Sequence, residues 1–348
     1  MNNAVPLLEG RDISKTFVSG TFRKRRNLAL DTISLTVDES PPTITAIAGE
    51  SGSGKTTLAR VLLGLITPTS GQVIYRGRDV ATMSGAEFRV FRREVQVIFQ
   101  DPFESYNPFY KIDHVLATPI RKYKLANNKS QAKELIVKAL ETVGLRPDET
   151  LGRYPHQLSG GQRQRIMVAR AVMLQPKIIV ADEPVSMVDA SLRATILETL
   201  RTLNDEFGIS ILYITHDLTT AYQIAENIIV LYKGTVAEAG EVEKVINSPT
   251  HPYTRLLVNS IPQPDPEQQW GSAGAGATLT GGQSGNGCVF YDRCPIREDR
   301  CDVSPPPLYH TDEYRVTRCY AYEDKGIFEK SLLSEVFIPA SEVAPIQD

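Results

Sequence analysis

Hydrophobic runs in the first 250 residues predict an α/β fold with parallel strands. Ile44–Ala48, Lys177–Ala181 and Ile209–Ile214 are short and almost entirely apolar, which is typical of strands buried on both faces of a parallel sheet. Apolar positions with helical spacing follow in residues 55–66 and about 190–207. Because the second of these helices lies between two of the strands, the pattern indicates a βαβ unit.

Shorter patterns complete the first 250 residues. Residues 130–145 have one apolar face at helical spacing and predict an amphipathic helix. Residues 227–231 and 235–239 alternate around a turn and predict a hairpin. Residues 72–99 consist of short strand-like runs separated by polar turns. We therefore expect short strands in that region.

The composition of the chain changes after about residue 250. Several prolines are followed by a run rich in Gly and Ser, and a segment of this composition, about 262–287, predicts a flexible linker. We therefore predict a first domain over residues 1–250 and a smaller C-terminal extension over residues 251–348.

Composition and charge narrow the classes of function. The chain has 348 residues, of which 41% are hydrophobic, so it can bury a core. Its net charge of −3 gives no electrostatic support for binding nucleic acid, and we expect no nucleic-acid partner. The sequence has no run of about 20 apolar residues, and its first residues lack signal-peptide features. We therefore expect a cytosolic protein that reaches a membrane only through a partner.

A phosphate-binding loop follows the first apolar strand. The residues from Gly49 to Thr56 match G-x-x-x-x-G-K-[ST] between a predicted strand and a predicted helix. Glycines let the backbone N–H groups surround phosphate oxygens, and the helix start adds a partial positive charge. Lys55 would contact the β- and γ-phosphates, and Thr56 would bind Mg²⁺. The predicted ATP contacts are Gly49, Glu50, Ser51, Gly52, Ser53, Gly54, Lys55, Thr56 and Thr57.

Two carboxylates follow another apolar strand. Asp182 comes directly after Ile178–Ala181, where a phosphoryl-transfer site needs a second Mg²⁺ ligand. Glu183 follows and would polarise the attacking water. The pair therefore predicts hydrolysis as well as binding.

Further motifs stand in order with the phosphate loop: Leu158-Ser159-Gly160-Gly161-Gln162, Gln100 and His216. With these residues the chain resembles the ATP-binding-cassette (ABC) ATPases over about residues 5–250. The resemblance implies an α/β P-loop NTPase core, an N-terminal antiparallel β subdomain and a helical subdomain at about 101–165. It also implies a head-to-tail dimer that encloses two ATPs.

The resemblance assigns further roles residue by residue. It places Phe17 against adenine, although an aromatic residue in an N-terminal strand can also belong to the core. Gln100 would contact Mg²⁺ and water, Glu183 would be the catalytic base and His216 would contact the γ-phosphate. Loop residues that would cross the dimer to the partner's ATP are Ser159, Gly160, Gly161, Gln162 and Asp189.

Two stretches resemble the dipeptide and oligopeptide importers of this family: the residues from Gln100 to Pro108 and those from Ser248 to Thr254. The resemblance implies an ATPase on the cytoplasmic face of the inner membrane that powers peptide import. Its partners would be a second ABC ATPase, identical or different, two transmembrane permease subunits and an extracytoplasmic substrate-binding protein. The alternative function is uptake of oligosaccharide or nickel, and a more remote alternative is a soluble ABC ATPase that takes no part in transport.

The four cysteines all lie in the C-terminal extension, at positions 288, 294, 301 and 319. Their spacing is neither a zinc ribbon nor a ferredoxin pattern, yet four thiolates in short loops could meet at one centre. Zinc and unliganded thiols are alternatives that the spacing leaves open. The resemblance implies that these residues hold a 4Fe–4S cluster, so we expect one at Cys288, Cys294, Cys301 and Cys319.

Overall fold

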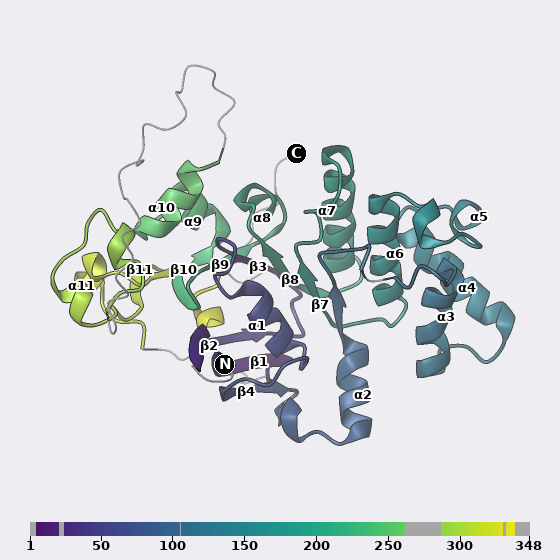
Figure 1. The fold of residues 1–348 in the computed structure, drawn as a ribbon, viewed down its shortest axis with the longest axis horizontal. Coiled ribbons are helices and arrows are strands. Elements are labelled where there is room, and N and C mark those ends of the chain that lie inside the picture. Colours follow the sequence, from purple (N-terminus) through teal and green to yellow (C-terminus); the bar gives the residue numbers. More distant parts are fainter. Residues whose placement is uncertain (1–4, 21–23, 105, 262–286, 330–331, 338–348) are drawn as a thin grey trace, which may run out of the picture.

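The computed structural model describes residues 5–20, 24–104, 106–261, 287–329 and 332–337. Two sheets organise these residues (Figure 1). The smaller sheet has the order β2-β1-β4-β5, with strands β1 (Leu8–Ser19), β2 (Arg25–Val37), β4 (Ser70–Tyr75) and β5 (Arg78–Asp79). The larger sheet has the order β11-β12-β10-β9-β3-β8-β7-β6, with strands β3 (Ile44–Ala48), β6 (Val95–Ile98), β7 (Ile178–Asp182), β8 (Ser210–Thr215), β9 (Asn227–Tyr232), β10 (Thr235–Glu241), β11 (Tyr309–Asp312) and β12 (Arg315–Thr317).

The centre of the larger sheet is parallel and fully buried, as its hydrophobic runs predict. β3 pairs in parallel with β8 and β9, and β7 pairs in parallel with β6 and β8. Every residue of β3, β7, β8 and β9 is buried. The carboxyl ends of β3, β7 and β8 therefore lie at one edge, where the predicted site residues follow them.

Helices cover the sheets and extend the molecule to one side (Figure 1). α3, α4 and α6 pack against one another, and α6 also packs against β6. The helices of the first 261 residues are α1 (Lys55–Leu62), α2 (Gly85–Glu94), α3 (Ile112–Tyr123), α4 (Lys129–Thr142), α5 (Pro147–Thr150), α6 (Gly160–Val172), α7 (Ala190–Asp205), α8 (Leu218–Ile224), α9 (Val242–Asn247) and α10 (Pro252–Asn259). Two short 3₁₀ turns, Val80–Thr82 and Pro155–Gln157, complete this part.

Two local predictions differ from the structure. The helix expected over residues 55–66 ends at Leu62, because Gly64 with φ of 62° stops it. The expectation of short strands over 72–99 is wrong in part, because α2 lies between the strands β5 and β6. Ser84 and Glu87 form a capping box at the start of α2, so the signal was present in the sequence.

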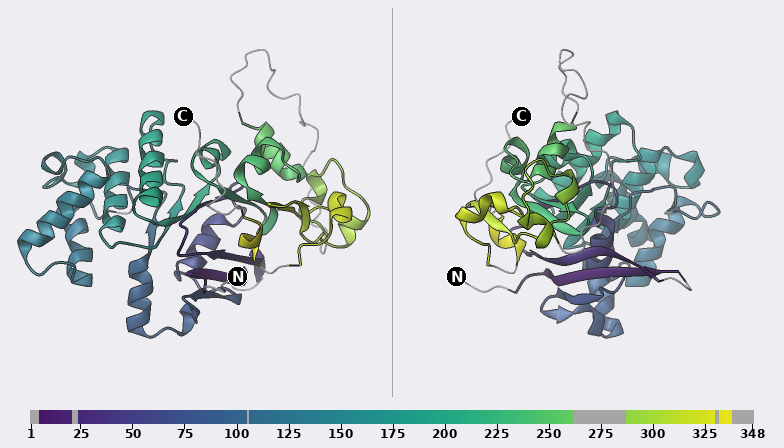
Figure 2. Two further views of the ribbon diagram at one scale, coloured as in Figure 1. Left: turned by 180° about the vertical axis from the view of Figure 1, so that it is seen from behind. Right: turned by 60° about the vertical axis from the view of Figure 1, so that its left-hand side comes forward.

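Residues 287–329 pack onto the larger sheet. β12 pairs antiparallel with β10, which places β11 at the sheet edge (Figure 2). Phe290 is buried against Tyr232 and Tyr253, with ring centroids 5.1 and 5.6 Å away. The linker predicted at about 262–287 lies, except for Gly287, outside the described residues. The remaining elements are α11 (Arg300–Val303) and the 3₁₀ turns Tyr291–Arg293, Tyr320–Lys325 and Leu333–Val336.

Candidate nucleotide site

The phosphate loop is the turn between β3 and α1, and its backbone requires glycine. Gly49, Gly52 and Gly54 have φ values of 147°, 81° and 107°. A Cβ on Gly54 would lie 2.5 Å from the carbonyl oxygen of Ala29, and one on Gly49 would clash with the carbonyl oxygen of Leu231. The loop therefore packs tightly against β2 and β9, with left-handed turns that only glycine adopts without strain.

Lys55 folds back over the loop that precedes it. Its Nζ donates hydrogen bonds to the carbonyl oxygens of Gly49 at 2.6 Å and Glu50 at 2.9 Å. Burial lowers the pKa of Lys55, while the charges of Glu183, Asp182 and Glu50 act in the opposite direction. The ammonium group is thus held beside the loop in a field of carboxylates.

One buried hydroxyl in the loop also fits an anionic ligand. Ser53 is buried, and its Oγ has no hydrogen-bond partner among the described residues. Ser51 and Gly52 are exposed, and Thr57 is half-buried on α1. An unpartnered buried donor between exposed backbone groups is what a phosphate-binding loop presents to its ligand.

Thr56 and Asp182 provide oxygen donors for Mg²⁺. Thr56 Oγ1 donates to Asp182 Oδ1 at 3.3 Å, across the gap between α1 and the end of β7. Burial raises the pKa of Asp182, and the Thr56 hydrogen bond opposes that shift. A hydroxyl and a carboxylate oxygen are the hard ligands that Mg²⁺ prefers, so these residues fit the ion.

Three residues from different strand ends meet at one carboxylate oxygen. Gln100 Nε2 donates to Glu183 Oε2 at 3.0 Å, and His216 Nδ1 lies 3.1 Å from the same oxygen. Glu183 has φ of 45°, and its N–H donates to the carbonyl oxygen of Ile214. The side chain is only 15% exposed, so its orientation is fixed by neighbours rather than by water. Such an arrangement suits a general base.

The motif of residues 158–162 begins α6. Ser159 and Gln162 form a capping box, in which the Ser159 hydroxyl accepts from the Gln162 N–H. Gly160 lies beside the Met187 carbonyl oxygen in the loop before α7, and Gly161 packs against Leu192 on α7, of which Asp189 is the N-cap. Figure 1 shows α6 and α1 on either side of α7 and β7. One chain therefore does not bring this motif to its own phosphate loop.

Phe17 lies on β1 with 41% of its surface exposed, and the Lys15 ammonium is 5.3 Å from its ring centroid. The alternative that Phe17 belongs to the core therefore does not hold. Its contact with adenine stays a prediction.

Sequence reasoning missed two residues that contact the phosphate loop from beyond residue 250. Arg293 forms a two-pronged ion pair with the Glu50 carboxylate, and the Tyr253 hydroxyl accepts the Glu50 N–H. Glu50, predicted as an ATP contact, thus has its carboxylate and its N–H bound to protein groups. The His251-Pro252-Tyr253 segment was a visible signal, but no sequence pattern pairs it with residue 50.

Two families match the sequence of this chain. The family described as "ABC transporter" matches residues 30–186, and that described as "Oligopeptide/dipeptide transporter, C-terminal region" matches residues 237–301. A Brucella ovis protein, named as the ATP-binding component of peptide import, is 41% identical over 87% of this chain and 94% of its own length. The oligopeptide transport ATP-binding protein of Escherichia coli is 39% identical over 75% of this chain and 79% of its own length.

Solved structures show the same cassette fold. An ATP-binding cassette, solved as a dimer in a post-hydrolysis state with ADP and Pi, matches with a TM-score of 0.60 and 29% identity. The match covers 68% of this chain and 98% of that one. This match confirms the predicted cassette fold. Separately, within the described ranges, no helix is long and apolar enough to cross a membrane.

The prediction of a 4Fe–4S cluster is wrong. The four cysteines border one small cavity together with Phe290 and Arg318, but the described part of the chain has no group of three or more His, Cys, Asp or Glu side chains that could hold a metal ion. The matched ATPase family does not call for a cluster either. Burial raises the pKa of Cys288 and Cys294, and that of Cys319 to about 11. The spacing of the four cysteines indicated that they lie in neighbouring loops, but it does not contain the direction in which each side chain points.

Proposed function

This chain belongs to the ATP-binding proteins of the ABC transporter family, and on that premise we propose that it hydrolyses ATP to power peptide import across the cytoplasmic membrane. The observation that carries the proposal is the convergence of Gln100, Glu183 and His216 at one oxygen. Asp182 and Thr56 lie next to this group at the same sheet edge. Binding groups and a hydrolytic base thus share one site.

The chemistry follows from the position of each group. The loop N–H groups and Lys55 would bind the phosphates, and bound Mg²⁺ would neutralise developing charge on them. Glu183 would accept the proton of the attacking water. Gln100 donates to the Glu183 carboxylate and so fixes its direction, and His216 would place a second donor near the γ-phosphate.

The site needs a second subunit. Ser159, Gly160, Gly161, Gln162 and Asp189 lie on the part of the chain that Figure 1 shows apart from α1. A head-to-tail dimer with another ABC ATPase, identical or different, would bring these residues to the partner's ATP. Phe17, exposed on β1, would stack on adenine.

Peptide as cargo is supported by the family match at residues 237–301 and by the names of the relatives. The chain would act at the cytoplasmic face of the inner membrane with two permease subunits and an extracytoplasmic substrate-binding protein. We assign residues 1–250 to the nucleotide-binding domain, with a helical subdomain at about 101–165. Residues 251–348 would be the C-terminal extension of the oligopeptide-transporter type, which carries the four cysteines.

The test is reconstitution of the complete transporter in vesicles, with ATP hydrolysis and uptake of labelled peptide measured together. Glu183→Gln should abolish both activities while ATP still binds, whereas Glu198→Gln, an exposed change on α7, should leave both unchanged. Hydrolysis at the normal rate by Glu183→Gln would refute the assigned base. Uptake of nickel or oligosaccharide in place of peptide would refute the cargo.

A further inference from the structure

Glu50 is the point where residues from beyond position 250 reach the phosphate loop. Arg293 Nη1 and Nη2 donate to Glu50 Oε2 and Oε1 at 3.0 and 2.9 Å. The Tyr253 hydroxyl accepts the Glu50 N–H at 2.8 Å. The first contact has the two-pronged geometry in which arginine binds a carboxylate most strongly and most directionally.

Both partners of Glu50 are held in place by their own surroundings. The Arg293 guanidinium lies 5.7 Å from the Tyr232 ring centroid and 5.6 Å from that of Phe290. Tyr253 is fully buried, with its ring 4.5 Å from that of Tyr232. Two aromatic rings, those of Tyr232 and Phe290, thus support the contacts, and neither side chain has to be ordered when ATP binds.

The remaining polar group of Glu50 points into the loop. Its carbonyl oxygen accepts the N–H of Ser53 at 3.1 Å and the Nζ of Lys55 at 2.9 Å. A displacement of Glu50 would therefore move the groups that hold Lys55. This links two side chains of the C-terminal part to the lysine of the phosphate loop through one residue.

We propose that Arg293 and Tyr253 are positioning residues for ATP binding, because they fix Glu50 and so preorganise the phosphate loop. Preorganisation raises affinity by removing an ordering cost from the binding step. The coupling is reciprocal, so bound ATP should also hold the segment around Arg293 more firmly on the core. The proposal rests on ATP binding at this loop and is independent of the cargo.

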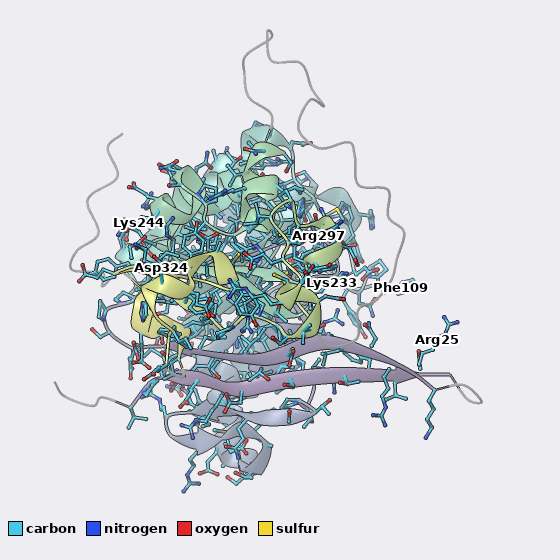
Figure 3. All side chains as sticks on the ribbon, turned by 90° about the vertical axis from the view of Figure 1, so that its left-hand side faces the viewer. Arg25, Phe109, Lys233, Lys244, Arg297 and Asp324 are labelled. Carbon is cyan, nitrogen blue, oxygen red and sulfur yellow. The ribbon has the colours of Figure 1, made fainter. Side chains whose placement is uncertain are left out.

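The test is a titration of the full-length chain with Mg²⁺ and a fluorescent ATP analogue. Arg293→Gln should raise Kd about 3- to 10-fold, because the pair is partly exposed and its contribution is modest. Arg293→Lys keeps the charge but loses the two-pronged geometry, so its Kd should lie between that of the unaltered chain and that of Arg293→Gln. Arg297→Gln is the matched control: this arginine of the same segment is exposed (Figure 3), lies over the Tyr291 ring, and its replacement should leave Kd unchanged.

A double-mutant cycle separates positioning from general loss of stability. Glu50→Gln and Arg293→Gln should each weaken binding, and the double variant should be no weaker than the worse single variant. Tyr253→Phe removes the hydroxyl that accepts the Glu50 N–H but keeps the aromatic ring, so it should raise Kd by a smaller factor than Arg293→Gln does. In the assembled transporter, Arg293→Gln should raise KM for ATP by the same factor and change kcat less than twofold.

Two results would overturn the proposal. One is a Kd for Arg293→Gln within 1.5-fold of the unaltered chain, and the other is full additivity in the cycle. Failure of the unaltered chain to bind the analogue, with Lys55→Ala as reference, would instead refute the proposed function itself. Hydrogen exchange gives an independent readout, because amides of residues 287–294 should exchange more slowly with ATP, and in Arg293→Gln they should not.

Discussion

Acid should destabilise the protein through His251. This residue is 4% exposed, and its Nδ1 accepts the N–H of Tyr253 at the start of α10. Burial lowers its pKa from 6.5 to about 4; a hydrogen bond with the Arg318 backbone opposes the shift, and the charges of Arg318 and Arg255 add to it. The Glu238 carboxylate, which faces the segment, accepts the His251 N–H. The folded state therefore requires a neutral imidazole.

The sign and size of the change in unfolding free energy with pH follow from the lowered pKa of His251. Since the folded state disfavours the proton, the stabilisation is complete above about pH 6.5 and is lost as pH falls through about 4. Complete protonation of His251 would cost about 3.5 kcal/mol of unfolding free energy, at about 1.4 kcal/mol per unit of pKa shift. Between pH 7.5 and 4.5, about 2.5 kcal/mol of unfolding free energy should disappear because of His251 alone.

The assay is urea unfolding at pH 7.5, 5.5 and 4.5 of the unaltered chain and His251→Asn. Asparagine retains an acceptor at the N-cap but does not titrate. The unaltered chain should therefore lose about 2.5 kcal/mol more than the variant over this range. His114→Asn, at an exposed position, should lose as much as the unaltered chain. An equal loss in the unaltered chain and His251→Asn, to within about 0.5 kcal/mol, would refute the reasoning.

Three substitutions test other contacts. Glu238→Ala should lower the unfolding free energy by about 3–5 kcal/mol, because three donors of residues 250–251 lose a buried acceptor. The control Glu243→Ala, at an exposed position, should change the unfolding free energy measured in urea by no more than about 0.5 kcal/mol. Similar losses in the two variants would contradict this prediction. Phe91→Ala should cost about 3–5 kcal/mol, since its ring is fully buried, and a loss below about 1 kcal/mol would contradict it. Gly54→Ala should weaken ATP binding at least tenfold in calorimetric titration, because its Cβ would clash with Ala29; normal affinity would show that the loop can shift.

The structure brings Gln100, Glu183 and His216 together, as expected from the order of the strands that precede them, and their roles in hydrolysis stay predictions. Asp182 is the last residue of β7, His216 directly follows β8, and the loop that leads to Lys55 follows β3; all three strands are buried. Those strands are neighbours in one parallel sheet, so their carboxyl ends bring the following residues together. Short-range pattern and topology were enough for this part of the site.

Other features depend on side-chain direction, which a pattern does not contain. The cysteine spacing indicated four thiols in neighbouring loops, and the cluster that the family resemblance implied there was wrong. The pair of Glu50 and Arg293 joins residues 243 positions apart, so no local period could indicate it. It depends on β12 pairing with β10 and on Phe290 packing beside Tyr232.

A continuous set of contacts explains why the segment around His251 belongs with the ATP site. Glu238 on β10 accepts the His251 N–H, His251 caps the helix that carries Tyr253, and the Tyr253 hydroxyl accepts the Glu50 N–H. Each step joins groups that are buried or held by buried neighbours, so a shift at one is not absorbed by water. The His-Pro-Tyr segment is thus far from the phosphate loop in the sequence but in direct contact with it in the structure. Its tyrosine accepts a hydrogen bond from the backbone of the phosphate loop, 203 residues earlier in the chain.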